Sequence, residues 1–175
     1  ANGHFLPEKI SPDLRVVFSA LNGTSQRLIP AVLERRGFDV GHNLLQVPQQ
    51  CRPDGSFATC AKPNPEEKPA LNAAVALAVR ENADMLVATD PDADRLGVGV
   101  RLTEKQMQSC QDDASVHDGY YLLSGNQQLV LLTDYILSQL TERDGALPHN
   151  SLISKTLVST DLAKTIADGY GVTTI

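Results

Sequence analysis

Cysteine is scarce in this sequence. The three cysteines, Cys51, Cys60 and Cys110, have neither the CxxC spacing of a zinc site nor the even count of a disulfide framework. Unpaired cysteines are typical of a reducing compartment, where thiols stay free. We therefore expect a cytoplasmic protein without a structural zinc site.

Long apolar runs and an excess of positive charge are also missing. No stretch approaches the ~20 apolar residues of a transmembrane helix, and no basic segment followed by an apolar one marks a signal peptide. Lys and Arg number 15 against 21 Asp and Glu, which gives a formal net charge of −6. Such a charge repels nucleic acid and anionic membranes, so we expect neither as a partner. A local basic pocket could still bind one small phosphate.

What the sequence does contain is enough apolar material for a core, because hydrophobic residues make up 42% of the chain. Short β-rich apolar runs alternate with segments of helical periodicity, a pattern typical of α/β proteins. We expect a layered α/β domain with a mixed sheet, followed by a partial second α/β domain of similar type. The expected strands are 14–20, 40–47, 85–89, 96–102, 152–158 and 172–175, and the expected helices are 25–36, 124–140, 161–170 and one within 65–82.

The start of the helix within 65–82 has two possible positions. Asn64 as N-cap, Pro65 in the first turn and Glu67 three residues after the cap form one start signal. Pro69 favours a later start, since it lacks a backbone donor and disfavours a helical conformation at Lys68.

We place the domain boundary in the polar, turn-like segment that follows the fourth expected strand. The expected divisions are a linker at 1–12, a first domain at 13–103, a variable connection at 104–119 and a partial domain at 120–175. The last five residues have the character of a buried strand, so we expect the sequence to be truncated.

The strongest chemical signal is an acidic loop between the strands expected at 85–89 and 96–102. Asp90, Asp92 and Asp94 alternate there, so a tight loop can turn three carboxylates toward one point. Three such charges repel one another unless a cation neutralises them, and ligands that are all oxygen suit Mg²⁺. Arg95 follows directly and carries a planar fork of donors suited to phosphate.

This loop has three other interpretations. It could be a solvated acidic turn in which Arg95 pairs locally. An EF-hand is excluded, because that motif requires Gly in place of Arg95 and Glu in place of Arg101. A phosphatase of the haloacid dehalogenase type is disfavoured, because its motif normally has Thr or Val in place of Asp94.

Residues Asn22, Gly23 and Thr24 follow the first expected strand. They could offer helix N-terminal amides to an anion, but a simple turn between strand and helix is the favoured interpretation. Asn64, Glu66 and Glu67 are better explained as helix-start residues than as ligands.

The acidic loop and four other stretches, in matching order, resemble the α-D-phosphohexomutases, the phosphoglucomutase and phosphomannomutase family. The loop with its flanking strands is ATDPDADRLGVGV (88–100). The opening of the family's second domain is similar to SALNGTSQRLIPAVLERRGF (19–38), and its Pro-rich segment to KPNPEE (62–67). The start of its third domain resembles LLSGNQQLVLLTDYI (122–136) and LISKTLVSTDLAKTIADGYGV (152–172).

The resemblance implies roles for particular residues. Asp90, Asp92 and Asp94 would ligate Mg²⁺, Arg95 would lie near the phosphates, and Lys155 matches a lysine that reaches into the active cleft. A strand-end surface lysine is the alternative interpretation of Lys155.

The resemblance also implies a reaction on a sugar phosphate such as glucose 1- or 6-phosphate. A phosphoserine in another domain would transfer its phosphoryl group through a bisphosphate intermediate. That catalytic serine loop is missing from this chain, so we expect the remaining domains as partners and no mutase activity from the chain alone. A phosphopentomutase of the same family, a Mg²⁺-dependent sugar-phosphate phosphatase and a non-catalytic binding module remain open.

Overall fold

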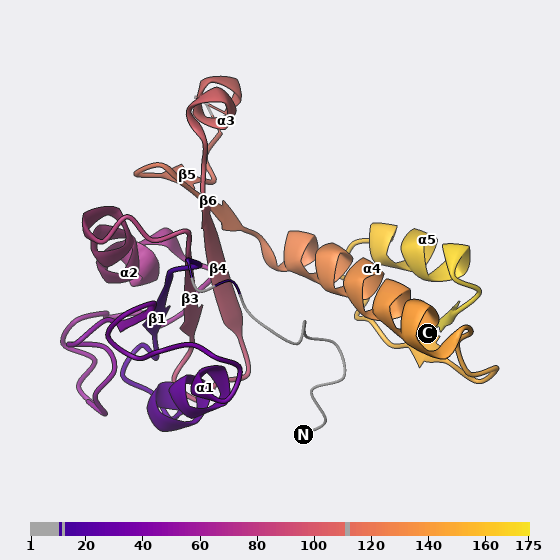
Figure 1. The fold of residues 1–175 in the computed structure, drawn as a ribbon, viewed down its shortest axis with the longest axis horizontal. Helices are drawn as coiled ribbons and strands as arrows, with labels where there is room; N and C mark the ends of the chain where they lie inside the picture. The colour runs from indigo at the N-terminus through magenta and orange to yellow at the C-terminus, as the bar shows by residue number, and fades with distance from the viewer. Residues whose placement is uncertain (1–10, 12, 111–112) are drawn as a thin grey trace. The chain divides into compact units, whose positions relative to one another are not determined.

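The structure is a computed structural model that describes residues 11, 13–110 and 113–175. These residues form two compact units that divide between Leu123 and Ser124 (Figure 1). The sequence places the division earlier, within 104–119. The linker predicted at 1–12 lies outside the described residues except for Ser11.

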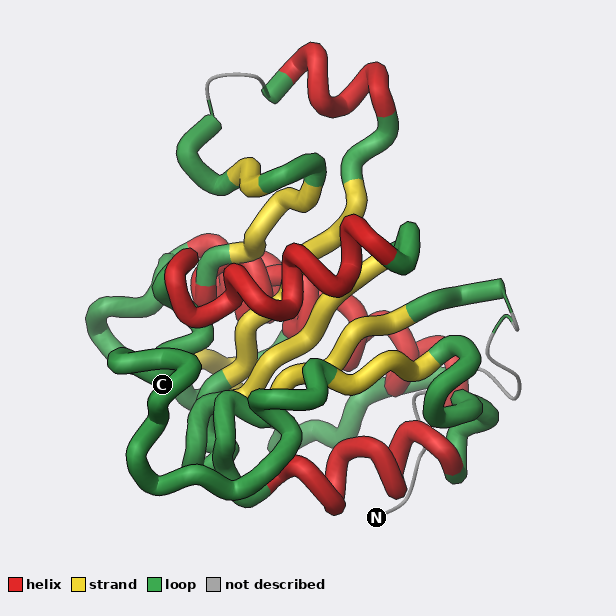
Figure 2. The backbone as a smooth tube through the Cα atoms, turned by 90° about the vertical axis from the view of Figure 1, so that its left-hand side faces the viewer, coloured by secondary structure: helices red, strands yellow, loops and turns green. Residues whose placement is uncertain are grey.

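The first unit is built around a mixed sheet, as the sequence predicts, and this sheet has six strands where four were expected. Its elements are β1 (Val16–Ser19), α1 (Ser25–Glu34), β2 (Leu44–Gln46), α2 (Lys68–Arg80), β3 (Met85–Thr89), β4 (Leu96–Arg101), α3 (Glu104–Ser109), β5 (Val116–His117) and β6 (Tyr120–Leu123). The strand order is β2-β1-β3-β4-β6-β5, and Figure 2 shows the strands side by side. β1 is parallel to both β2 and β3, whereas β4 to β6 join the sheet in antiparallel pairs.

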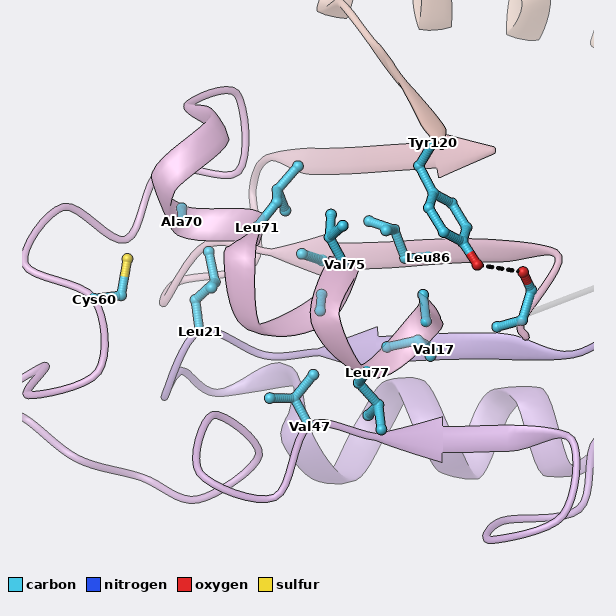
Figure 3. Packing of buried hydrophobic residues seen from close by; sticks show 14 residues of the cluster. Val17, Leu21, Val47, Cys60, Ala70, Leu71, Val75, Leu77, Leu86 and Tyr120 are labelled. Carbon is cyan, nitrogen blue, oxygen red and sulfur yellow. Dashed lines mark hydrogen bonds between the residues drawn. The ribbon is translucent and has the colours of Figure 1, made fainter. Parts of the chain in front are cut away.

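Alternate residues of β1 pack into different layers, because successive strand side chains point to opposite faces of a sheet. Val17 belongs to the core beneath α2, together with Val75 (Figure 3). Val16 and Phe18 belong to a second core that Ile29 of α1 contacts. The two helices therefore cover opposite faces of the sheet.

The α2 helix begins at Lys68, with Glu67 as its N-cap. The start signal centred on Asn64 was wrong, and the later start that Pro69 favoured is the one observed. Pro69 fits only the first turn, where its missing N–H leaves no helical hydrogen bond unmade. Asn64 instead accepts a hydrogen bond from the Glu66 amide at 3.1 Å, which forms a turn before the helix.

The segment expected to be a variable connection contains regular structure. α3 begins with a capping box in which Thr103 and Gln106 satisfy each other's backbone amides. β6, which the sequence assigned to the following domain, pairs with β4 and belongs to the first sheet. The Tyr120 hydroxyl donates a hydrogen bond of 2.6 Å to the Ala83 carbonyl and ties β6 to the connection between α2 and β3 (Figure 3).

The second unit contains α4 (Gly125–Asp144), β7 (Leu152–Ile153), α5 (Leu162–Gly169) and β8 (Thr173–Thr174). β7 and β8 pair in parallel. The strand predicted at 152–158 ends after two residues, because a turn closed by the Thr156 and Ser159 hydroxyls follows it. None of the helices in the described part of the chain is both long and apolar enough to span a membrane.

Candidate functional site

The acidic residues lie on a hairpin loop, residues 90–95, that we call the Asp loop. Thr89 at the end of β3 pairs with Leu96 at the start of β4, so the hydrogen-bonded strands hold both ends of the loop. Inside the loop, the Ala93 amide donates to the Asp90 carbonyl at 3.1 Å. Ala93 adopts a left-handed conformation with φ of 65°, which is uncommon for a residue other than glycine. Such backbone is found preferentially at functional sites.

The three aspartates converge, as the sequence predicts. One carboxylate oxygen from each of Asp90, Asp92 and Asp94 lies within 4.8 Å of the other two. Asp90 is buried, whereas Asp92 and Asp94 are exposed. The cluster therefore has a protein-facing side at Asp90 and a side open to solvent.

The carboxylates differ in their electrostatic surroundings. Burial acts to raise the pKa of Asp90, but hydrogen bonds from the Arg95 amide, Asp94 and Asp92, together with the Arg95 charge, lower it below the ordinary value. The pKa of Asp94 is raised, first by its hydrogen bond with Asp90 and then by the charges of Asp92 and Asp90. Asp94 therefore binds a proton more tightly than a lone aspartate does, and a cation would relieve the same repulsion between the carboxylates.

The donor set fits a hard divalent cation. An octahedral Mg²⁺ ion binds oxygen at ~2.1 Å, so opposite ligands lie ~4.2 Å apart. The three carboxylate oxygens lie within 4.8 Å of one another, a separation comparable to this value. The exposure of Asp92 and Asp94 leaves room for water or a phosphate oxygen in the remaining positions.

Arg95 lies beside the carboxylates. Its Nε is 3.7 Å from Asp90 Oδ2 and 3.8 Å from Asp94 Oδ1, and its side chain is 54% exposed. The local pairing is the feature expected of a solvated turn. The exposure keeps the guanidinium accessible to a phosphate.

Lys155 belongs to the second unit and follows β7. Its Nζ lies 3.0 Å from Asp161 Oδ1 and donates to the Ser159 carbonyl at 3.1 Å. Only 11% of its side chain is exposed, so it is not the surface lysine of the alternative interpretation. These contacts give it a role in closing the turn before α5, and its binding to phosphate stays a prediction.

The turn between β1 and α1 also contacts the Asp loop. Thr24 donates to the Pro91 carbonyl, and Ser25 shares a hydrogen bond with Thr89. We did not predict these contacts, although the parallel pairing of β1 and β3 brings the residues after both strands to one edge of the sheet. Asn22 is buried and bonds the carbonyls of Gln49 and Arg52, both at 2.8 Å.

The amide of Thr24 donates to Pro91 and Asn22 serves as an anchor, so the segment is the simple strand–helix turn that the sequence favours.

Comparison with known proteins gives consistent matches. Residues 4–103 match the family model described as "Phosphoglucomutase/phosphomannomutase, alpha/beta/alpha domain II". The phosphoglucomutase of Staphylococcus aureus strain USA300 is 38% identical over 155 residues, and that of strain N315 is 39% identical over the same number. Each match covers 89% of this chain and 24% of the relative, so the chain spans about a quarter of these relatives' length.

A solved structure has the same fold. The crystal structure of a phosphoglucomutase/phosphomannomutase family protein from Burkholderia thailandensis matches 93% of this chain and 28% of its own chain, with a TM-score of 0.63. The sequence identity is 23%, so this likeness concerns the fold alone.

Proposed function

The chain belongs to the phosphoglucomutase/phosphomannomutase family, and on this premise we propose that its Asp loop holds the Mg²⁺ ion of a sugar-phosphate mutase. The observation that carries the proposal is the convergence of three carboxylate oxygens within 4.8 Å on a loop held by two paired strands. The family membership and the fit of an all-oxygen donor set to a hard cation support the same assignment.

The proposed reaction moves a phosphoryl group between the 1- and 6-positions of a sugar phosphate. An enzyme phosphoserine gives its phosphoryl group to the sugar, and the resulting bisphosphate returns its other phosphate to the serine. The chain contains no T-A-S-H-N-P sequence of the kind that carries this serine in the family. The phosphoserine would therefore come from another part of the protein.

Within this reaction the chain's residues would have distinct tasks. Asp90, Asp92 and Asp94 would bind the cation, and Mg²⁺ when bound would draw negative charge away from the phosphoryl group during transfer. Arg95 would donate hydrogen bonds to phosphate oxygens. Lys155 would bring a second positive charge to the substrate. Phosphoryl transfer depends on orientation and a dry, preorganised site, so we propose that the chain alone is inactive.

The proposed setting is the cytoplasm, with a sugar phosphate and the other domains of the protein as partners. Cys51, Cys60 and Cys110 are free thiols in the structure, in keeping with a reducing compartment. The net charge of −6 disfavours nucleic acid as a partner.

The proposal is tested by a coupled assay that converts glucose 1-phosphate to glucose 6-phosphate in the presence of Mg²⁺ and a bisphosphate primer. The assay compares a polypeptide of the relatives' length that carries this chain, its Asp92→Asn variant and the 175-residue chain. We expect activity in the first only. Loss of a Mg²⁺ ligand should lower the rate at least about a hundredfold, since metal ions contribute several kcal/mol to such transition states.

An Asp39→Asn variant is the matched control, because Asp39 is an exposed aspartate in the connection between α1 and β2, at the other end of β1 from the Asp loop. Turnover by the 175-residue chain alone would contradict the proposed need for other domains. Release of inorganic phosphate without a primer would indicate a phosphatase instead. Conversion of ribose 1-phosphate but not glucose 1-phosphate would indicate a phosphopentomutase, and no turnover at all would leave a binding module.

A further inference from the structure

We infer that the turn between β1 and α1 is a positioning clamp that holds the Asp loop in its metal-binding conformation, an inference that rests on the proposed function. The clamp consists of Gly23, Thr24 and Ser25. None of these three residues is among the proposed Mg²⁺ ligands. They contact Pro91 and Thr89, which lie on either side of Asp90 in the sequence.

The closest contact of the clamp is between Gly23 and Pro91. A Cβ atom at position 23 would lie 2.2 Å from Pro91 Cα and 2.4 Å from the Pro91 carbonyl oxygen. Both are backbone atoms, so no side-chain rotation could relieve the overlap. Any side chain at position 23 would therefore push the Asp loop away from the turn.

Thr24 holds the same residue by hydrogen bonds. Its amide donates to the Pro91 carbonyl at 2.8 Å, and its hydroxyl donates to the same oxygen at 3.1 Å. Proline has no N–H, so this carbonyl is the one backbone group through which Pro91 can be held. Because the carbonyl belongs to the peptide that leads into Asp92, these bonds fix the direction in which Asp92 leaves Pro91.

Ser25 extends the contact to the strand before the loop. Its hydroxyl lies 2.5 Å from the Thr89 hydroxyl, and both side chains are buried. The Asn22 side chain anchors the turn by donating hydrogen bonds to the Gln49 and Arg52 carbonyls. The clamp is thus an anchored element and not a loose loop.

The expected consequence concerns metal affinity. Mg²⁺ demands near-ideal octahedral geometry, so carboxylates that are already oriented bind it more tightly than carboxylates on a mobile loop. Removing one clamp hydrogen bond should weaken Mg²⁺ binding about threefold to tenfold, the range expected for a single neutral hydrogen bond.

The test uses the 175-residue chain and two measurements. Isothermal titration with MgCl₂ gives the Mg²⁺ dissociation constant, and hydrogen exchange followed by NMR gives the protection of the Ala93 and Arg95 amides without metal. Both amides bond to Asp90 within the loop. The variants are Thr24→Val, which removes the hydroxyl at similar volume, and Thr24→Ser, which restores it.

A second pair of variants tests the steric contact. Gly23→Ala introduces the overlap with Pro91, whereas Gly55→Ala is the control, because a Cβ at Gly55 meets no atom within 4 Å. We expect Gly23→Ala to weaken Mg²⁺ binding more than tenfold and Gly55→Ala to leave it unchanged. If circular dichroism shows that Gly23→Ala does not fold, the test of the clamp rests on Thr24→Val and Thr24→Ser.

The clamp is supported if Thr24→Val weakens Mg²⁺ binding and speeds exchange of the two amides while Thr24→Ser restores both. It is overturned if Thr24→Val, folded like the wild type, changes neither. A wild-type chain that binds no Mg²⁺ would count against the proposed metal function alone. In that case faster exchange in Thr24→Val would support the clamp, and unchanged exchange would overturn it.

Discussion

The three carboxylates of the Asp loop have unequal environments. Asp90 is 6% exposed and accepts a 3.0 Å hydrogen bond from the Arg95 amide, so its negative charge is stabilised by the protein. Asp94 is exposed, and its pKa is raised first by its hydrogen bond with Asp90 and then by the charges of Asp92 and Asp90. In the metal-free chain, the charge of Asp94 therefore opposes folding.

The Asp94→Asn substitution should have opposite effects on stability and on metal binding. Because the pKa of Asp94 is higher in the folded state, its ionisation destabilises the fold as the pH rises through that raised pKa. At pH 7 the metal-free variant should therefore melt at a higher temperature than the wild type, and the difference should shrink as the pH falls through the pKa of Asp94. Its Mg²⁺ affinity should fall at least about tenfold with one ligand lost.

Differential scanning calorimetry between pH 3 and 7 measures the melting temperatures, and titration with MgCl₂ measures the Mg²⁺ affinity. Asp39→Asn, remote from the Asp loop, should change neither by a comparable amount. A metal-free Asp94→Asn variant that melts below the wild type at pH 7 would show that Asp94 stabilises the loop by another interaction.

The α2 helix packs in the core of the first unit and directly precedes β3, the strand that leads into the Asp loop. One of its faces packs on the sheet, and the other faces solvent. Val75 and Val79 are one helical turn apart, with exposed fractions of 0% and 51%. This helix thus contains one valine in the core and one valine at the surface.

Val75→Ala should lower the free energy of unfolding by about 2 kcal/mol, because it removes buried apolar surface and leaves a small cavity. Val79→Ala should change it by less than about 0.5 kcal/mol, since alanine favours the helix and little burial is lost. Urea unfolding followed by circular dichroism gives both values. Equal losses for the two variants would contradict the packing of α2 on the sheet.

The two compact units differ in the size of their cores. In the first unit one cluster alone contains fourteen buried residues, contributed by several strands and by α2. In the described part of the second unit, the buried apolar cluster consists of Leu137, Ala167 and Val172. Local opening is easiest where few apolar contacts must be broken, so the second unit should be the less stable of the two.

Hydrogen exchange measured by mass spectrometry on the 175-residue chain should show this difference. Peptides from β1 and β3 should exchange slowly, since both strands are paired on each side. Peptides from α4 and α5 should exchange at least about tenfold faster. Exchange from α4 as slow as that from β3 would show that the second unit is stabilised to the same degree as the first.

The sequence by itself determined the features that depend on local pattern. Apolar runs ended by polar residues located β3, β4 and the Asp loop between them, and three alternating aspartates predicted the convergence that the structure shows. The alternation of strands and helices gave the mixed α/β class. Local chemistry also limited the start of α2 to two positions, and Pro69 favoured the one observed.

Tertiary structure decided the features that depend on partners distant in the sequence. Tyr120–Leu123 could belong to either unit until its pairing with β4 placed it in the first sheet, because strand pairing satisfies backbone groups far apart along the chain. Likewise, Pro91, whose carbonyl Thr24 holds, lies 67 positions after Thr24 in the sequence. Only the parallel pairing of β1 with β3 brings the two together, since no local pattern specifies which strands become neighbours.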